Sequence, residues 1–94
     1  MIYEWDEAKR AANLAKHGVD FAAVRSFEWD TALRFPDRRK DYGEARWLLL
    51  GMICRRLHLL VFTEREDRVR VISLRKANQK ERARYETEID SQHA

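Results

Sequence analysis

The 94-residue sequence has one cysteine, one proline and three glycines, and it has no long apolar run. Because Cys54 is alone, neither an internal disulfide nor a thiolate metal cluster can form. The isolated glycines at positions 18, 43 and 51 argue against a glycine-rich nucleotide-binding loop. No segment approaches the roughly 18 apolar residues of a membrane-spanning helix, and residues 1–6 lack the features of a signal peptide. We therefore expect a cytoplasmic protein that does not contact a membrane.

Familiar catalytic patterns are also missing. The Asp and Glu residues are scattered and form no group suited to paired magnesium ions, and His and Cys show no zinc-site spacing. No nucleophile elbow of the serine hydrolases is present. The sequence therefore predicts neither a metal nor a cofactor.

Arginine, in contrast, is abundant. Fourteen of the nineteen basic residues are Arg, and residues 65–84 carry a net charge of +5 in a chain whose total is +3. The planar guanidinium group can bind phosphate through two hydrogen bonds, which a charge needed only for solubility does not require. Nucleic acid is thus the leading partner class, and solubility or an acidic protein partner is the alternative.

Local signals predict a single α+β domain over residues 1–94. Asp6 suits an N-cap and Gly18 a C-terminal stop, so residues 6–18 predict a helix, whose Ala8, Ala11, Ala12 and Ala15 could face a sheet. Asp20 is expected to cap a second helix. We expect strands at 2–5 and 31–35, then an antiparallel meander of strands at 45–53, 57–64 and 68–75. Asn78 and Glu81 form a capping-box pattern that opens a C-terminal helix to about residue 88.

Alternation along the meander predicts two faces of the sheet. The two helices are expected to cover the better core face, which holds Trp47, Leu49, Leu60, Phe62, Ile72 and Leu74. The other face is expected to be apolar in its middle, with basic residues at two corners: Arg46, Leu48, Leu50, Leu57, Leu59, Val61, Thr63, Arg65, Val69, Val71, Ser73 and Arg75. The corners would lie about 20 to 25 Å apart on a flat hairpin, so arginines of both can hold one phosphate only if the sheet bends them together.

Three ordered blocks resemble one protein family. "YEWDEAKRAANLAKHGVDF", "GEARW" and "VFTEREDRVRVISLRKANQKERARYE" resemble the BrnT toxins of bacterial type II toxin-antitoxin systems. The resemblance covers residues 2–86 and implies a RelE-like fold. It also implies a messenger RNA endonuclease that halts translation and is held inactive by a BrnA-like antitoxin with a ribbon-helix-helix DNA-binding domain. The toxin-antitoxin pair would bind its own promoter DNA.

The side chains present can support such chemistry without a metal. RNA cleavage needs proton transfer from the 2′-hydroxyl and to the leaving oxygen, together with cations around the phosphorane. His17 is the natural proton carrier, and its place at a helix C-terminus should favour the protonated form; alternatively, it only caps the helix. Arg65 and Arg75, which lie in the blocks that carry the resemblance, are the candidates for charge stabilisation.

Four further residues are candidate RNA contacts: Lys16, Arg46, Lys76 and Tyr85. Arg46 could instead pair with Glu44 or Glu64, and Tyr85 could pack the last helix on the sheet rather than stack on a base. A non-catalytic basic module that binds nucleic acid or an antitoxin is the alternative function, because phosphate binding and phosphate chemistry use the same arginines. Under either reading we expect an antitoxin to cover Leu48, Val61 and Val71.

Overall fold

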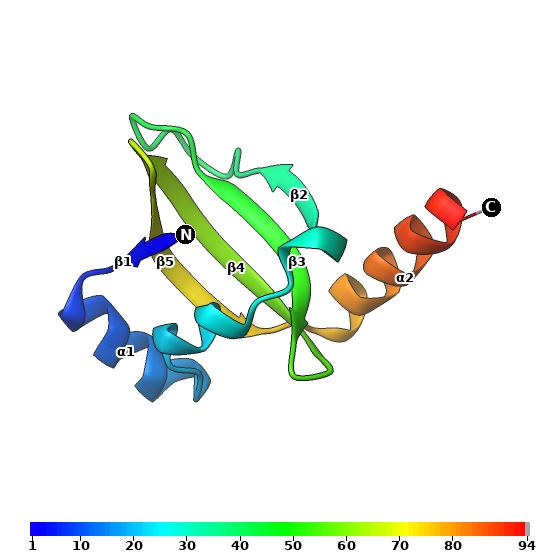
Figure 1. Ribbon diagram of the computed structural model, residues 1–94, viewed down its shortest axis with the longest axis horizontal. Coiled ribbons are helices and arrows are strands. Elements are labelled where there is room, and N and C mark those ends of the chain that lie inside the picture. Colours follow the sequence, from blue (N-terminus) through cyan, green and yellow to red (C-terminus); the bar gives the residue numbers. More distant parts are fainter. Residues whose placement is uncertain (94) are drawn as a thin grey trace.

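A five-stranded sheet forms the centre of the computed structural model, which describes residues 1–93 (Figure 1). Ala94, the last residue of the predicted domain, lies outside them. The strands are β1 (Ile2–Glu4), β2 (Leu33–Pro36), β3 (Trp47–Ile53), β4 (Arg56–Arg65) and β5 (Arg68–Lys76). Their order is β1-β5-β4-β3-β2; β1 is parallel to β5, and the other neighbours are antiparallel. The predicted α+β class and the antiparallel meander are confirmed.

The helix ends follow the predicted capping residues. The Asp6 carboxylate accepts hydrogen bonds from the first turn of α1 (Glu7–His17), and Gly18 ends this helix in the left-handed region at φ 71°. Asn78 and Glu81 exchange side-chain-to-backbone hydrogen bonds at the start of α2 (Gln79–His93), so the capping box is confirmed. This helix is longer than predicted.

The second predicted helix is of a different type. Asp20 caps it as expected, but η1 (Phe21–Ser26) is a 3₁₀ helix, and a second short one, η2 (Trp29–Thr31), follows. The amide of Glu28, between them, donates to the carbonyl of Met52 in β3. The tighter helix therefore ends early enough for the chain to bond to the sheet.

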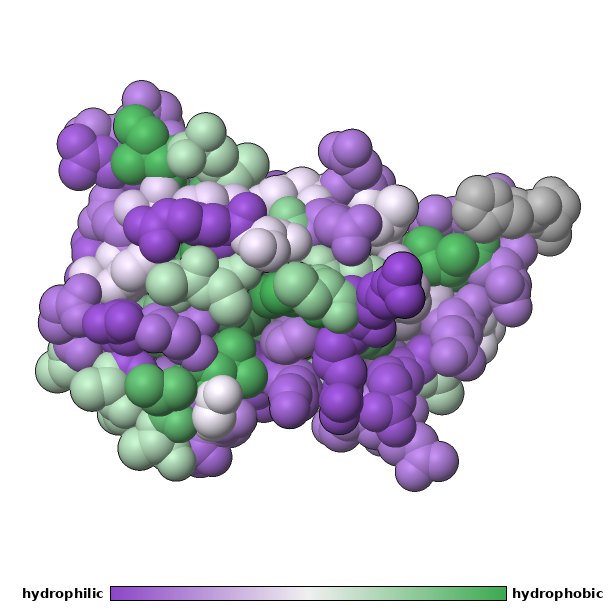
Figure 2. Space-filling view, turned by 60° about the horizontal axis from the view of Figure 1, so that its bottom comes forward, coloured by the Kyte–Doolittle hydropathy of each residue, from purple (hydrophilic) through white to green (hydrophobic). Residues whose placement is uncertain are grey.

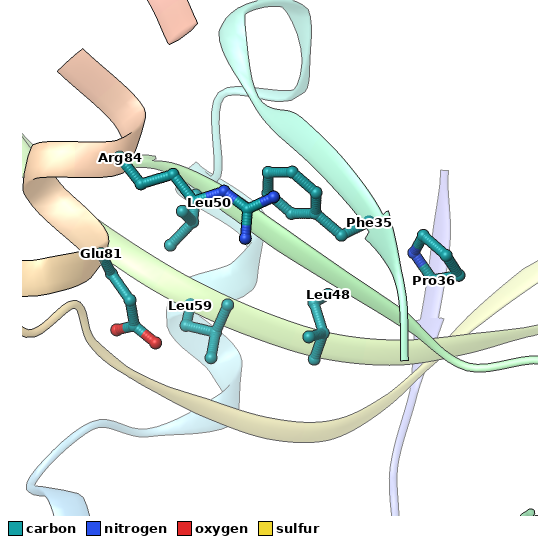
Figure 3. Close-up of a pocket in the computed structure, with 7 residues that line it drawn as sticks. All are labelled: Phe35, Pro36, Leu48, Leu50, Leu59, Glu81 and Arg84. Atoms are coloured by element: carbon teal, nitrogen blue, oxygen red, sulfur yellow. The ribbon is translucent and has the colours of Figure 1, made fainter. Parts of the chain in front are cut away.

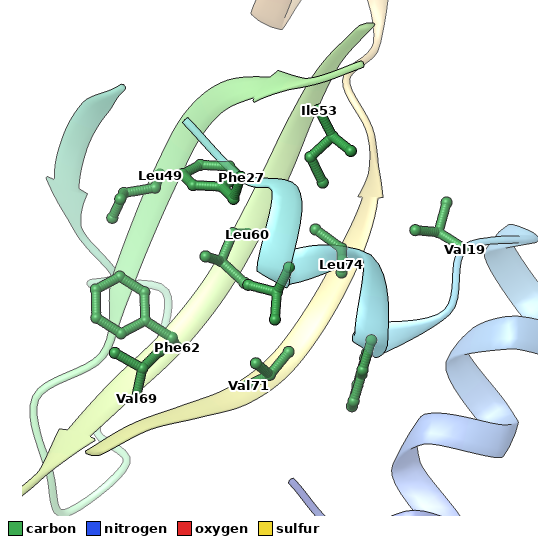
Figure 4. Close-up of a cluster of buried hydrophobic side chains, with 11 residues drawn as sticks. Val19, Phe27, Leu49, Ile53, Leu60, Phe62, Val69, Val71 and Leu74 are labelled. Carbon is green, nitrogen blue, oxygen red and sulfur yellow. The ribbon is translucent and has the colours of Figure 1, made fainter. Parts of the chain in front are cut away.

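The main core lies between the sheet and the N-terminal helical segments (Figure 4). We call this side of the sheet the α1 face. A Cβ atom at Gly51 would lie 2.9 Å from Phe27 Cε1, which is too close. Gly51 therefore lets the Phe27 ring lie directly on β3. The buried members of this core are Val19, Phe21, Val24, Phe27, Leu49, Ile53, Leu60, Phe62, Val69, Val71 and Leu74.

A register shift changes the predicted faces of β5. Leu59 and Val61 share a face with Ser73 and Arg75, as alternation predicted: Leu59 pairs with Arg75 and Val61 with Ser73. The next pair along β4, however, is Phe62 with Val71, across a β-bulge. The extra residue moves Val69 and Val71 to the α1 face, so their predicted place beside Ser73 and Arg75 is wrong. Val71 is 1% exposed in the core and is not available to an antitoxin.

The opposite side of the sheet, the α2 face, carries a smaller core. Leu33, Leu50, Leu57, Leu59 and Ala77 are buried there, and Tyr85 and Ile89 of α2 pack against them. The rest of α2 projects away from the sheet (Figure 1). The α2 face therefore has an apolar part that the helix covers and a part that it leaves open.

Candidate RNA-binding site

The helix α1 contacts the sheet through an asparagine, because Asn13 is its one buried residue. Ala8, Ala11, Ala12 and Ala15 are exposed, so the prediction that they face the sheet is wrong. The strand β1 pairs with residues 68–70 only, which leaves the following part of β5 without a strand on that side. Asn13 occupies this edge: its Nδ2 donates to the carbonyl oxygen of Leu74 at 2.7 Å, and its Oδ1 accepts from the Leu74 amide at 3.3 Å.

A groove runs along this junction between α1 and β5. Its volume is about 240 Å³, and it is lined by Lys9, Ala12, Asn13, Lys16, His17, Ile72 and Ser73. Among residues 1–93 no carboxylate lines the groove, and its two lysines, Lys9 and Lys16, project from one face of the helix. The predicted residues Lys16 and His17 thus lie in a groove whose other wall is β5, the strand that also carries Arg75.

The electrostatic environment of His17 differs from the prediction. Partial burial lowers its pKa from the ordinary 6.5, and the positive charges of Lys16 and Arg75 lower it further. The pKa of His17 is thus shifted in the direction opposite to the expected bias toward the protonated form. At neutral pH the imidazole is mainly uncharged and can accept a proton.

Arg75 is held by a carboxylate of α2. Its two terminal nitrogens donate to the two oxygens of Glu81, each at 2.8 Å, and the two side chains are only 27% and 22% exposed. Arg75 lowers the pKa of Glu81, so the carboxylate is ionised at neutral pH. The arginine thus stands near His17 while its hydrogen-bonding edge is occupied.

The second predicted arginine lies at another corner of the α2 face. Arg65 is six residues beyond Leu59, the partner of Arg75, which corresponds to about 20 Å along β4. It is half exposed and pairs loosely with Glu44 at 3.3 Å. The hypothesis that Arg65 and Arg75 converge on one patch is wrong, and each has its own carboxylate.

Arg46 also lies at the Arg65 end of the sheet. Its guanidinium carbon lies 3.9 Å from the centre of the Tyr42 ring. Its Nε is buried without a hydrogen-bond partner, and among residues 1–93 it forms no ion pair with Glu44 or Glu64. Arg46 directly precedes β3, whose first residue pairs with Phe62, so Arg46 and Arg65 share one end of the sheet, away from the groove.

The two remaining candidates lie near the base of α2. Lys76 is an exposed residue at the end of β5. The Tyr85 ring packs on the α2 face and its hydroxyl donates to the carbonyl of Thr31 at 3.0 Å. In this structure Tyr85 therefore packs the last helix on the sheet, which was the alternative to stacking on a base. Figure 2 shows hydrophilic residues gathered where α2 leaves the sheet.

A shallow apolar hollow opens beside α2 (Figure 3). Its volume is about 330 Å³, and Arg84 reaches across it to stack on Phe35 with its guanidinium carbon 4.0 Å from the ring centre. The walls come from three strands and one helix: Phe35, Pro36, Leu48, Leu50, Leu59, Glu81 and Arg84. The predicted antitoxin contact Leu48 thus lies in a concave apolar surface.

No three His, Cys, Asp or Glu side chains between residues 1 and 93 are grouped so that they could hold a metal ion. No helix there combines the length and the apolar character needed to span a membrane.

The sequence interpretation missed Asn13 and the second role of Glu81. Asn is disfavoured inside helices, so its place within an alanine-rich helix was a signal that it has a tertiary contact. Glu81 was recognised as a capping residue, but its bond to Arg75 depends on how the chain turns between β5 and α2.

The fold and the groove define a small basic α+β protein with cations beside a histidine at the edge of its sheet. The model of a family described as ribonuclease toxin, BrnT, of type II toxin-antitoxin system matches residues 5–81. The chain belongs to this family, so the resemblance noted above is confirmed. A search of curated proteins found no match. Membership implies an RNA substrate and an antitoxin partner.

Proposed function

We propose that this protein is a metal-independent endoribonuclease that cuts messenger RNA in the cytoplasm and thereby inhibits translation. The observation that carries the proposal is the groove between α1 and β5, in which Lys16 and His17 lie within the electrostatic reach of Arg75. Family membership supports the ribonuclease class.

His17 has the central role in the proposed reaction. Its uncharged imidazole takes the proton of a 2′-hydroxyl, whose oxygen then attacks the adjacent phosphorus and displaces the 5′-oxygen. The leaving 5′-oxygen takes up a proton from solvent water, and the imidazolium returns its proton to solvent. The products are a 2′,3′-cyclic phosphate and a 5′-hydroxyl. Lys16 and Arg75 stabilise the additional negative charge on the phosphorane, and Arg75 must leave Glu81 to do so.

The other basic corner binds RNA farther along the strand. Arg65 is too distant to touch the linkage held by Arg75, so we assign it with Arg46 to backbone phosphates. Lys76 adds a charge near the base of α2, and Tyr85 offers a base-stacking surface only if α2 moves. This division gives both corners of the α2 face a role without requiring them to meet.

The activity test uses purified protein and single-stranded RNA in EDTA. Cleavage should persist in the chelator and yield cyclic phosphate ends. It should fall at least tenfold in Arg75→Ala and His17→Gln, the loss of about 1.4 kcal/mol of transition-state stabilisation. Arg82→Ala, which removes an exposed charge from α2, is the matched control. Full activity in both Arg65→Ala and Arg75→Ala would refute the site.

We further propose that a ribbon-helix-helix antitoxin of the BrnA type covers the α2 face and that the pair binds promoter DNA through the antitoxin. Val61 is only 4% exposed, so its predicted contact with the antitoxin is wrong. The apolar hollow and the half-buried Leu48 in its wall support the α2 face as the binding surface, and the basic corners favour acidic partner residues. Hydrogen exchange of the complex should show protection at these positions. Protection confined to α1 and η1 would contradict the masking model.

A non-catalytic basic module is the second candidate. The ion pairs of Arg65 and Arg75 favour it, because both guanidinium groups are occupied by carboxylates in the free chain. This alternative predicts salt-sensitive binding of RNA without cleavage under any of the conditions above.

A further inference from the structure

We propose that Asn13 is the positioning residue of the groove: it joins α1 to the unpaired edge of β5, so that Lys16 and His17 stand beside Ser73 and Arg75. The inference rests on the proposed function for the purpose of the groove. It concerns how the fold builds the groove rather than which residues touch RNA.

The outer edge of β5 has backbone groups that need hydrogen-bond partners. Beyond Arg70 no strand of the described residues 1–93 lies on the outer side of β5, yet Leu74 is completely buried. Because Leu74 belongs to a buried strand, its outward amide and carbonyl groups need partners inside the protein. The Asn13 amide supplies both a donor and an acceptor, as a neighbouring strand would.

The Asn13 side chain also fixes the end of α1. The Nδ2 of Asn13 also donates to the carbonyl of Val19 at 3.0 Å, just after the Gly18 stop. One amide therefore connects the helix, the segment that follows the helix, and β5. We call this connection the joint. Asn13 is only 8% exposed, so its side chain is buried inside the joint.

The contact at Asn13 also sets where Lys16 and His17 lie in the groove. Lys16 and His17 follow Asn13 by three and four positions, so they lie one turn farther along nearly the same side of α1. Ser73, whose Oγ is 3.5 Å from Asn13 Oδ1, lies on the strand side. A displacement of α1 at Asn13 therefore separates the helix cations from the strand residues.

The test compares Asn13→Ala with Val24→Ala, which weakens the core without touching the joint. The pKa of His17 is followed by NMR, with His17→Gln to assign its signal. In the unaltered chain and in Val24→Ala it should stay below 6.5. In Asn13→Ala it should return toward 6.5, because the displaced helix end exposes the imidazole to solvent and moves it away from Arg75. Asn13→Ser, which replaces the amide by a shorter group that can still donate and accept a hydrogen bond, should give a smaller shift and serves if the Ala variant does not fold.

RNA binding is measured on the same proteins with a 2′-O-methyl oligonucleotide, which cannot be cleaved. In Asn13→Ala the slope of log K against log salt should fall by about 0.7, the effect of one lost phosphate contact on a single strand. An unchanged His17 pKa in the Asn13 variants, or an equal shift in Val24→Ala, would overturn the positioning role. If the unaltered chain binds no RNA, the proposed function fails, while the His17 titration still decides how the groove is built.

Discussion

Replacing Glu81 by glutamine should strengthen RNA binding, because the Glu81 carboxylate competes with phosphate for Arg75. The pair is bidentate, with two 2.8 Å hydrogen bonds between partly buried side chains. Glutamine keeps an oxygen that can accept from the Asn78 amide, so the start of α2 should survive. The change removes the negative charge and one of the two acceptors offered to Arg75.

The expected size follows from the burial of the pair. An exposed ion pair contributes up to about 1 kcal/mol, and a buried hydrogen bond to a charged group about 1.5 to 3 kcal/mol. The Arg75–Glu81 pair lies between these cases, so its release should change the binding free energy by about 1 kcal/mol, or roughly fivefold in Kd.

Fluorescence anisotropy with a labelled 2′-O-methyl oligonucleotide measures the effect at about 0.15 M salt. Glu86→Gln is the matched control, because it removes the same charge from an exposed position of α2 and should change Kd less than twofold. In an Arg75→Ala background the gain from Glu81→Gln should disappear. Equal affinity of the Glu81→Gln and Glu86→Gln proteins would show that this ion pair does not restrain Arg75.

Three further predictions concern stability. Burial is the main cause that lowers the pKa of His58 from 6.5, so the unfolded chain takes up a proton at a higher pH than the folded one. The free energy of unfolding, measured in urea, should therefore fall as the pH drops below about 6.5, and His58→Gln should reduce this loss. Gly51→Ala should destabilise the fold by about 1 to 3 kcal/mol in the same assay, because a methyl group there collides with Phe27, and no loss would mean that the ring moves freely. Arg55 has φ 68° in the β3–β4 turn, so Arg55→Gly should raise Tm by about 4 to 8 °C per kcal/mol of relieved strain, whereas a lower Tm would contradict that strain.

The elements that the sequence predicted well are those with local causes. Asp6 and Gly18 bound α1 through their own backbone preferences, and Asn78 and Glu81 open α2 within one turn of chain. Alternation likewise placed Leu59 and Arg75 on the same face of the sheet. Each of these features depends on residues that are neighbours in sequence or on a regular period of two.

The features that the sequence did not predict depend on distant contacts. The β5 bulge reverses the faces of Val69 and Val71, and no residue between 68 and 76 is a glycine that would mark it. The 3₁₀ form of η1 is tied to the bond from Glu28 to Met52 across the core. Distances between the arginine corners likewise require the real curvature and register of the sheet.

An abundance of arginine in the sequence is therefore different from positive charge that is free to bind RNA. Glu4 contacts both Arg68 and Arg70, Glu44 contacts Arg65, and Glu81 contacts Arg75. Exposed pairs such as Arg65–Glu44 are weak, so an RNA phosphate can replace the carboxylate at little cost. The partly buried Arg75–Glu81 pair is harder to open, and opening it loosens the contact between β5 and α2. RNA should consequently bind first at the Arg65 corner and reach Arg75 only after Glu81 has released it. In the proposed reaction, movement of α2 is therefore the step that separates RNA binding from cleavage.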